Sequence, residues 1–204
     1  MLRRLGVLLF CLSLTSCTAL PSHQQRVAEA DRLAAEKHWH SVVLNTGSFD
    51  LVAYLADGIA PAEQVTVYIE GDGLAWVSSE LPSVDPTPVN PLALRLALAQ
   101  PKDKAAYLGR PCQFVNITAD GLCNRSYWTD KRFSPEIISA MNAALDQVKQ
   151  RMAAKTLTLV GYSGGGAVAV NGGSRRAAEA QSLQLNRQQL TCSKYMRLEP
   201  NWRH

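Results

Sequence analysis

Histidine is scarce in this sequence, and no stretch is long and apolar enough to cross a membrane permanently. Only four histidines occur in 204 residues, three of them before residue 41 and the fourth at position 204. The apolar stretch Leu5 to Leu14 has about ten residues, whereas a permanent membrane helix needs about 20. No internal repeat and no heptad pattern is present. With 47% apolar and 19% charged residues, the chain has the composition of one ordinary globular domain.

The first residues have the pattern of an export signal. Arg3 and Arg4 precede the apolar stretch, and small residues lead to Cys17. The alternative, a short N-terminal core strand, is disfavoured by the two arginines at the chain terminus. Residues 14–17, Leu-Thr-Ser-Cys, resemble the lipobox of bacterial lipoproteins, which implies cleavage before Cys17 and lipidation of its thiol. Because Thr18 rather than Asp follows, the resemblance implies sorting to the outer membrane, facing the periplasm.

Cys11 leaves with the signal and Cys17 would carry lipid, so three cysteines remain, and the expected periplasmic location allows disulfides to persist. Cys112 and Cys123 lie eleven positions apart in a polar stretch with an Asp120-Gly121 turn between them. A disulfide is expected here, worth about 3 kcal/mol on the chain-entropy estimate. The alternative, a metal pair, would need closer spacing and nearby histidines, so no metal is expected. Cys192 is then an odd thiol.

Apolar periodicity and cap signals predict alternating strands and helices. Ser134, Pro135 and Glu136 form an N-cap, a first-turn proline and a first-turn acid, which together start a long helix. The predicted helices cover 22–37, 92–100 and 135–152, and the predicted strands cover 41–45, 49–55, 64–69, 105–108 and 156–160. The two runs 41–45 and 49–55 indicate a hairpin. The alternation predicts an α/β fold with a mostly parallel sheet flanked by helices.

A G-x-S-x-G motif follows the last predicted strand: Gly161, Tyr162, Ser163, Gly164 and Gly165. Between a buried strand and a helix, this motif is typical of a nucleophile elbow, in which a strained turn presents the serine hydroxyl. The Gly164 N–H is then placed to bind an oxyanion. The alternative is a glycine-rich turn with an incidental serine. A phosphate-binding loop is disfavoured because neither Gly-Lys-Ser/Thr nor G-x-G-x-x-G is present.

A second glycine loop, Glu70-Gly71-Asp72-Gly73, follows the predicted strand 64–69. In an elbow architecture such a loop supplies the second oxyanion N–H, and the backbone around Gly71 and Asp72 is the candidate. On its own, Gly-Asp-Gly would be read as a tight turn.

Several motifs together resemble the first two-thirds of the α/β-hydrolase fold, and more narrowly a group of exported bacterial α/β-hydrolase-like lipoproteins of undefined substrate. The motifs are YIEGDGLAW, DPTPVNPLAL, GRPCQ, a second cysteine before YWTDKRFSPE, and GYSGGG. The likeness covers about residues 38–170. It implies a serine hydrolase of esterase or lipase type without a cofactor, with Ser163 as nucleophile and an ester or acyl substrate.

The pattern breaks after Val170. The resemblance implies an acid and then a histidine on later strand ends, roughly 60 residues beyond the serine, but 41 residues remain. These contain Glu179, Glu199 and His204, and only 32% of residues 171–204 are apolar. We therefore expect a partial hydrolase, truncated or frameshifted after the elbow, with its last strands, acid and base missing and with weak or no activity. The alternative is a non-catalytic envelope lipoprotein or a pseudogene remnant.

The charge distribution excludes nucleic acid as a partner. The formal charge is +4 overall. Two arginines lie in the signal, and residues 171–204 hold six basic against two acidic residues, so residues 17–170 carry a net charge of −2. The expected organisation is a signal over 1–16, a tether and helix over 17–37, a partial hydrolase domain over 38–170 and an atypical tail over 171–204. The expected partner is a membrane, through the lipid on Cys17.

Overall fold

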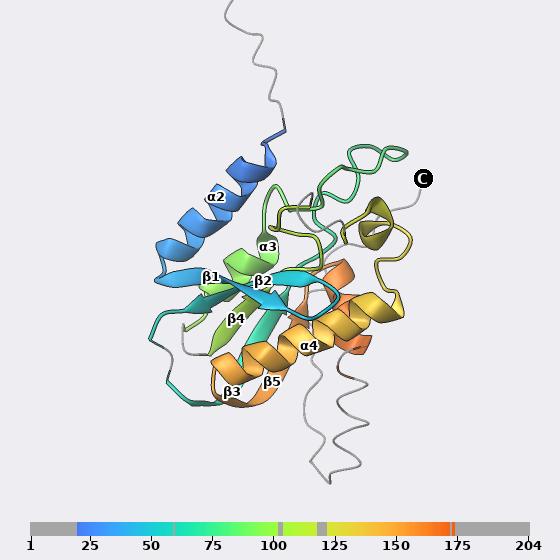
Figure 1. Cartoon of the computed structure of the whole chain (residues 1–204). Helices are drawn as coiled ribbons and strands as arrows, with labels where there is room; N and C mark the ends of the chain where they lie inside the picture. Colours follow the sequence, from blue (N-terminus) through green and yellow to red (C-terminus); the bar gives the residue numbers. More distant parts are fainter. Residues whose placement is uncertain (1–19, 59, 102–103, 118–121, 172, 174–204) are drawn as a thin grey trace, which may run out of the picture.

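The computed structural model describes residues 20–58, 60–101, 104–117, 122–171 and 173. In this part of the chain five strands form one sheet in the order β1-β2-β4-β3-β5, with helices on both faces (Figure 1). The expected signal (1–16), the lipidation site Cys17 and nearly all of the tail (171–204) lie outside the described residues. No described helix combines the length and apolar character needed to cross a membrane.

The elements match the predicted order, with boundaries that differ by a few residues. The helices are α2 (His23–Ala35), α3 (Leu92–Leu98), a short 3-10 helix η2 (Arg125–Trp128) and α4 (Pro135–Arg151). The strands are β1 (Trp39–Asn45), β2 (Asp50–Ala56), β3 (Ala62–Ile69), β4 (Ala105–Leu108) and β5 (Ala154–Gly161). Residues 164–171 are also helical. Ser134 takes the N-cap position of α4, but its side chain makes no capping hydrogen bond, contrary to the usual role of a serine there.

The sheet has a parallel half and an antiparallel half. β4, β3 and β5 are parallel neighbours, which confirms the predicted α/β arrangement for the strands nearest the glycine motifs. β1 and β2 form the predicted hairpin, and β2 pairs antiparallel with β4. The register sets Ile69 opposite both Leu108 and Gly161, so the carboxyl ends of β4, β3 and β5 lie level. The loops that follow these three strands therefore meet at one edge of the sheet.

Each face of the sheet has its own core. Strand side chains such as Val67, Ile69 and Leu159 pack with the buried face of α4 on one side. On the other side Tyr68 and Tyr107 pack with α2 and α3. Strand alternation explains this division, because successive residues point to opposite faces. In β3 the burial is confined to the second half of the strand, because Glu63 and Gln64 at its start are exposed.

α2 is fixed at both its start and its buried face. Ser22 and Gln25 form a reciprocal capping box at its N-terminus. The buried Arg26 donates from Nη2 to Asp85 Oδ2 at 2.6 Å and from Nη1 to the Thr87 carbonyl oxygen. These bonds join the start of α2 to the loop that precedes α3.

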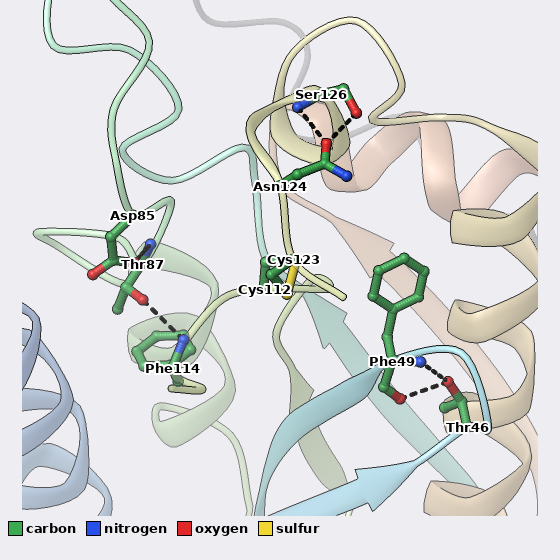
Figure 2. Close-up of a disulfide and its surroundings, with 9 residues drawn as sticks. All are labelled: Thr46, Phe49, Asp85, Thr87, Cys112, Phe114, Cys123, Asn124 and Ser126. Atoms are coloured by element: carbon green, nitrogen blue, oxygen red, sulfur yellow. Dashed lines mark hydrogen bonds between the residues drawn. A yellow bond between two sulfur atoms is a disulfide. The ribbon is translucent and has the colours of Figure 1, made fainter. Parts of the chain in front are cut away.

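A disulfide joins Cys112 to Cys123, the pair expected from the sequence, with a Cα–Cα distance of 5.7 Å (Figure 2). It anchors the loop after β4, in which Cys112 and Phe114 both have positive φ angles. The Phe114 N–H donates to Thr87 Oγ1 at 2.9 Å, which links this loop to the one before α3.

Candidate active site

The G-x-S-x-G motif forms a sharp turn between β5 and the helix over 164–171. Ser163 has a φ of +50°, a left-handed conformation that is strained for any residue except glycine. A Cβ on Gly161 would lie 2.2 Å from the Gly165 carbonyl oxygen, and one on Gly165 would lie 2.5 Å from the Ile69 carbonyl oxygen. The two outer glycines are thus required by close backbone contacts. Ser163 is exposed at the turn, as an elbow presents it.

The Glu70–Gly73 loop lies directly against this turn. A Cβ on Gly71 would lie 3.2 Å from Ser163 Cβ and 3.0 Å from Tyr162 Cδ1. The Tyr162 N–H donates to the Ile69 carbonyl oxygen at 3.0 Å, which ties the turn to the end of β3. The two glycine motifs, 92 positions apart from Gly71 to Ser163, therefore form one site because β3 and β5 are neighbours.

The backbone N–H groups of Asp72 and Gly164 have no hydrogen-bond acceptor among the described residues, and the same holds for their neighbours Gly73 and Ser163. The Gly71 N–H, by contrast, donates to the Glu70 carboxylate Oε1 at 3.0 Å and is already used. Of the two predicted residues, Gly71 and Asp72, the structure therefore leaves the N–H of Asp72 available, and Gly71 contributes the close approach to the serine instead.

Glu70 is a buried carboxyl group behind the loop. Its side chain is 1% exposed and accepts hydrogen bonds from the Gly71 N–H and from the Tyr107 hydroxyl at 3.2 Å. Burial raises the pKa of Glu70 above its usual range, while the bonds from the Gly71 and Ala93 backbone N–H groups act in the opposite direction. Burial also raises the pKa of Tyr107, so its hydroxyl stays protonated as a donor. Glu70 thus connects the end of β3 to β4 and to the start of α3.

An ion pair holds the Asp72 side chain beside Gly164. Arg110 Nη1 donates to Asp72 Oδ1 at 2.7 Å, and its Nη2 donates to the Arg132 carbonyl oxygen. A Cβ on Gly164 would lie 2.2 Å from Asp72 Oδ1 and 2.8 Å from Arg110 Nη1. Burial lowers the pKa of Arg110, and the charge of Asp72 offsets this effect. Glycine at position 164 is therefore what admits this ion pair next to the serine.

The loop after β4 supports the same contacts. The buried Gln113 donates from Nε2 to the Gly71 carbonyl oxygen at 3.0 Å, and its Oε1 accepts from the Arg110 N–H at 3.0 Å. Both residues stand beside Cys112, so the disulfide loop fixes the chain that holds Gly71 and Asp72.

A pocket of about 290 Å³ opens in front of Ser163. Its lining residues come from three places, the glycine loop, the segment before α3 and the elbow: Glu70, Asp72, Gly73, Leu74, Pro88, Val89, Asn90, Tyr162 and Ser163. The volume is close to the lower bound for small-molecule sites. The serine, the two available N–H groups and a partly apolar pocket are therefore side by side.

A base for the serine is absent from the described part of the chain, where no group hydrogen-bonds the Ser163 hydroxyl. His40 lies on β1, and its Nδ1 is 2.5 Å from Asp57 Oδ1. β1 is separated from β5 by four strand spacings, about 19 Å, so His40 is far from the serine. His38 immediately precedes β1, and the Nδ1 of His23 lies 2.8 Å from Asp85 Oδ2. His38 and His40 therefore cannot serve Ser163 within this fold. His204 and Glu199 lie outside the described residues, as does Glu179.

Sequence reasoning missed the supporting polar residues Glu70, Tyr107, Arg110 and Gln113. A signal existed for Glu70, because a carboxyl group directly after an almost continuous apolar strand must find partners if it is buried. Arg110 and Gln113 stood in the GRPCQ motif, but nothing in its local pattern pointed to Asp72, 38 positions away. No group of three or more possible metal ligands occurs among the residues that the structure places.

Solved structures similar to this chain include hydrolases. A hormone-sensitive lipase from a metagenome library matches at 13% identity with a TM-score of 0.41, covering 85% of this chain and 52% of the other. Brefeldin A esterase, described as a bacterial homologue of human hormone-sensitive lipase, matches at 13% identity with a TM-score of 0.39. The match covers 83% of this chain and 48% of the esterase. A dienelactone hydrolase-like promiscuous phosphotriesterase from metagenomic libraries matches at 19% identity with a TM-score of 0.37. The match covers 65% of this chain and 52% of the phosphotriesterase. The chain thus spans about half the length of these proteins. No protein-family model and no curated protein matches it.

Proposed function

We propose that this protein is a serine hydrolase of esterase or lipase type that acts by acyl transfer, with Ser163 as the nucleophile. One observation carries the proposal: Ser163 has a left-handed backbone at the end of a parallel strand, and the unused N–H groups of Asp72 and Gly164 accompany it. A glycine-rich turn with an incidental serine would not need this strain or a second loop packed against it.

The reaction assigns a role to each of these groups. Ser163 Oγ attacks the carbonyl carbon of an ester in the pocket, and its proton passes to a base. The carbonyl oxygen becomes an oxyanion, which accepts hydrogen bonds from the Asp72 and Gly164 N–H groups. The alcohol leaves with a proton, and an acyl group remains on Ser163. Water then releases it as an acid.

The proton-accepting step is the weak point of the site. Without a histidine and an orienting acid, serine retains only the contribution of the oxyanion site and of substrate binding. Since the described residues provide no base for Ser163, we propose that this chain reacts slowly.

Labelling with a fluorophosphonate tests the proposal directly. Ser163 Oγ would displace fluoride from phosphorus, and its proton would go to the base. We expect a slow adduct on Ser163, mapped by mass spectrometry, that is absent from Ser163→Ala and from urea-unfolded protein. Added imidazole should accelerate it by supplying the base. A rate at Ser163 no higher than at the exposed Ser79 would overturn the proposal.

A second candidate function is a non-catalytic envelope lipoprotein that keeps the fold for binding or as a remnant. The missing hydrogen-bond partner of the Ser163 hydroxyl favours it within the described residues. A folded, protease-resistant product in the envelope without any Ser163 adduct, even with imidazole, would support this candidate. Rapid degradation in cells would instead indicate a remnant.

We further propose attachment to the bacterial envelope through lipid on Cys17, at the outer membrane. The lipobox-like residues 14–17 support this proposal. Several acyl chains on one residue suffice for stable attachment. Mass spectrometry of the mature N-terminus tests it: an unmodified or uncleaved Cys17 would contradict it.

A further inference from the structure

Between β3 and α3 a small ordered hairpin carries a group of exposed apolar side chains. We name residues 75–84 the apolar hairpin. Its side chains Trp76, Val77, Leu81 and Val84 are 45%, 50%, 56% and 71% exposed. Together with Val89 they are five of the eleven large apolar residues that are exposed in the described chain. Such a concentration on one loop is typical of a binding surface rather than of scattered surface residues.

The hairpin is held rigidly, so the exposure is not the result of a frayed loop. Trp76 forms a bridge with Pro82, and the Val77 N–H donates to the Leu81 carbonyl oxygen at 2.8 Å. At its base the Ser83 N–H donates to the Ala75 carbonyl oxygen at 2.9 Å, and Trp128 Nε1 donates to the Ser83 carbonyl oxygen at 3.2 Å. Ala75 and Ser83 are buried, so the apolar side chains extend outward from an anchored base.

The hairpin lies next to the point where the N-terminal segment enters the fold. Arg26 and His23, in the first turns of α2, both bond to Asp85, the residue directly after the hairpin. Figure 1 shows the start of α2 and the segment between β3 and α3 at the same end of the molecule. Five positions separate Cys17 from Ser22, at most about 17 Å of extended chain. A lipid on Cys17 would therefore hold the hairpin close to the membrane surface.

The hairpin also borders the pocket in front of Ser163. Leu74 and Val89, on either side of the hairpin in sequence, both line this pocket. Residues 74–94 contain no lysine or arginine, and Asp85 is paired with Arg26, which leaves Glu80 as the exposed charge. The surface is therefore suited to an uncharged, apolar layer and not to anionic headgroups.

From these observations we propose that the apolar hairpin inserts into the periplasmic face of the membrane that carries the Cys17 lipid, and that it places the Ser163 pocket against acyl esters of that membrane. The inference rests on the proposed function. It adds a second, protein-mediated membrane contact and narrows the substrate class to membrane-embedded esters. A tryptophan with aliphatic neighbours is suited to the boundary between headgroups and acyl chains. Because residues 74–94 contain no lysine or arginine, the contact should be insensitive to salt and to anionic lipid.

Spin-label accessibility tests the docking. In a Cys192→Ser background, a nitroxide is attached at Val84→Cys or, as the matched control, at Val43→Cys on β1, where Val43 is 58% exposed. The lipidated full chain is reconstituted in phosphatidylethanolamine vesicles with and without phosphatidylglycerol. We expect the Val84 label to gain oxygen collisions and lose collisions with a water-soluble nickel chelate, equally in both lipids, while the Val43 label stays in water. Replacing Trp76 and Leu81 by lysine should return the Val84 label to water without detaching the protein.

Every other outcome of the spin-label experiment contradicts either the docking of the hairpin or the lipid anchor on Cys17. A Val84 label as water-accessible as the Val43 label on vesicle-bound protein refutes the docking while leaving the Cys17 anchor intact. If the Val84 label is already immobilised without vesicles, the hairpin is covered by protein, either by another part of this chain or by a second copy. This outcome also refutes the docking in the membrane. If Cys17 carries no lipid, the anchor fails, and the Val84 measurement with added vesicles still decides the docking. Fluorophosphonate labelling of Ser163, run in parallel, reports on the proposed hydrolase separately.

Discussion

Arg110 Nη1 lies 2.7 Å from Asp72 Oδ1, and this carboxylate fills the space that any side chain at position 164 would need. One buried cation therefore fixes the side chain of the residue whose N–H is available beside Ser163. A second arginine, Arg132, also faces Asp72, but its Nε lies 3.7 Å from Asp72 Oδ2 and its side chain is more exposed than that of Arg110. The two arginines consequently differ in what their removal should do.

Arg110→Met should lower the free energy of unfolding by about 2 kcal/mol, because Asp72 and the Arg132 carbonyl oxygen lose a charged donor. Arg132→Met, the matched control, should cost less than about 1 kcal/mol because its pairing with Asp72 is longer and half-exposed. Urea denaturation measures both. Arg110→Lys should fold but slow the fluorophosphonate reaction at Ser163, since the single nitrogen of lysine does not reproduce the two separate donor nitrogens with which Arg110 bonds Asp72 and the Arg132 carbonyl oxygen. Equal labelling in Arg110→Lys and the unchanged protein would contradict a positioning role.

Ser163→Gly should be more stable than Ser163→Ala by about 1 kcal/mol. Both substitutions remove the hydroxyl, but only glycine relieves the left-handed strain at φ +50°. Thermal or urea unfolding of the pair measures the difference. If the two variants are equally stable, Ser163 does not carry this strain in solution.

Gly165→Ala and Gly166→Ala should have opposite effects although they are neighbours. At Gly165 a Cβ would meet the Ile69 and Glu70 carbonyl oxygens at 2.5 Å, so we expect a loss of about 1–3 kcal/mol or more. At Gly166 the nearest atom would be 3.6 Å away, an ordinary contact, and alanine should stabilise the helix by up to about 1 kcal/mol. Unfolding midpoints that shift in the same direction would refute this packing argument.

Breaking the disulfide by replacing Cys112 and Cys123 with serine should cost about 3 kcal/mol of unfolding free energy. Because Arg110 and Gln113 flank Cys112, the same change should also slow labelling at Ser163. Cys192→Ser provides the control and should leave both quantities unchanged. Denaturation under oxidising and reducing conditions measures the change in unfolding free energy. If a reducing agent leaves the unfolding free energy of the unchanged protein as it was, the prediction is wrong.

Glu70 should make the stability depend on pH. Its pKa in the folded state is raised by burial above the ordinary value of 4.5, so the folded protein retains this proton to a higher pH than the unfolded chain. The stability contributed by the protonated group is complete below the ordinary pKa and is lost as pH rises through the raised one. Glu70→Gln should remove this fall. The difference in unfolding free energy between the two proteins, measured from about pH 4 to about pH 7, should therefore change; a constant difference would refute the assignment.

The local signals of the sequence were sufficient for the elements and for the two glycine motifs. Ser22, Pro135 and the strand patterns placed the helices and strands within a few residues, because capping and periodicity are local properties. The polar support of the site could not be predicted in this way. Glu70 with Tyr107, and Asp72 with Arg110, are pairs separated by 37 and 38 positions, and only the strand order brings them together.

The sheet register has a consequence for how the protein folds. β1 and β2 pair across a short turn, whereas Thr156 on β5 bonds to Glu63 on β3 across 93 positions. Closing so long a loop is slow compared with forming a local hairpin. The turn that presents Ser163 should therefore be among the last parts to acquire its native arrangement. During that interval the chain would have a formed N-terminal hairpin but no assembled site, which makes Ser163 reactivity a late reporter of complete refolding.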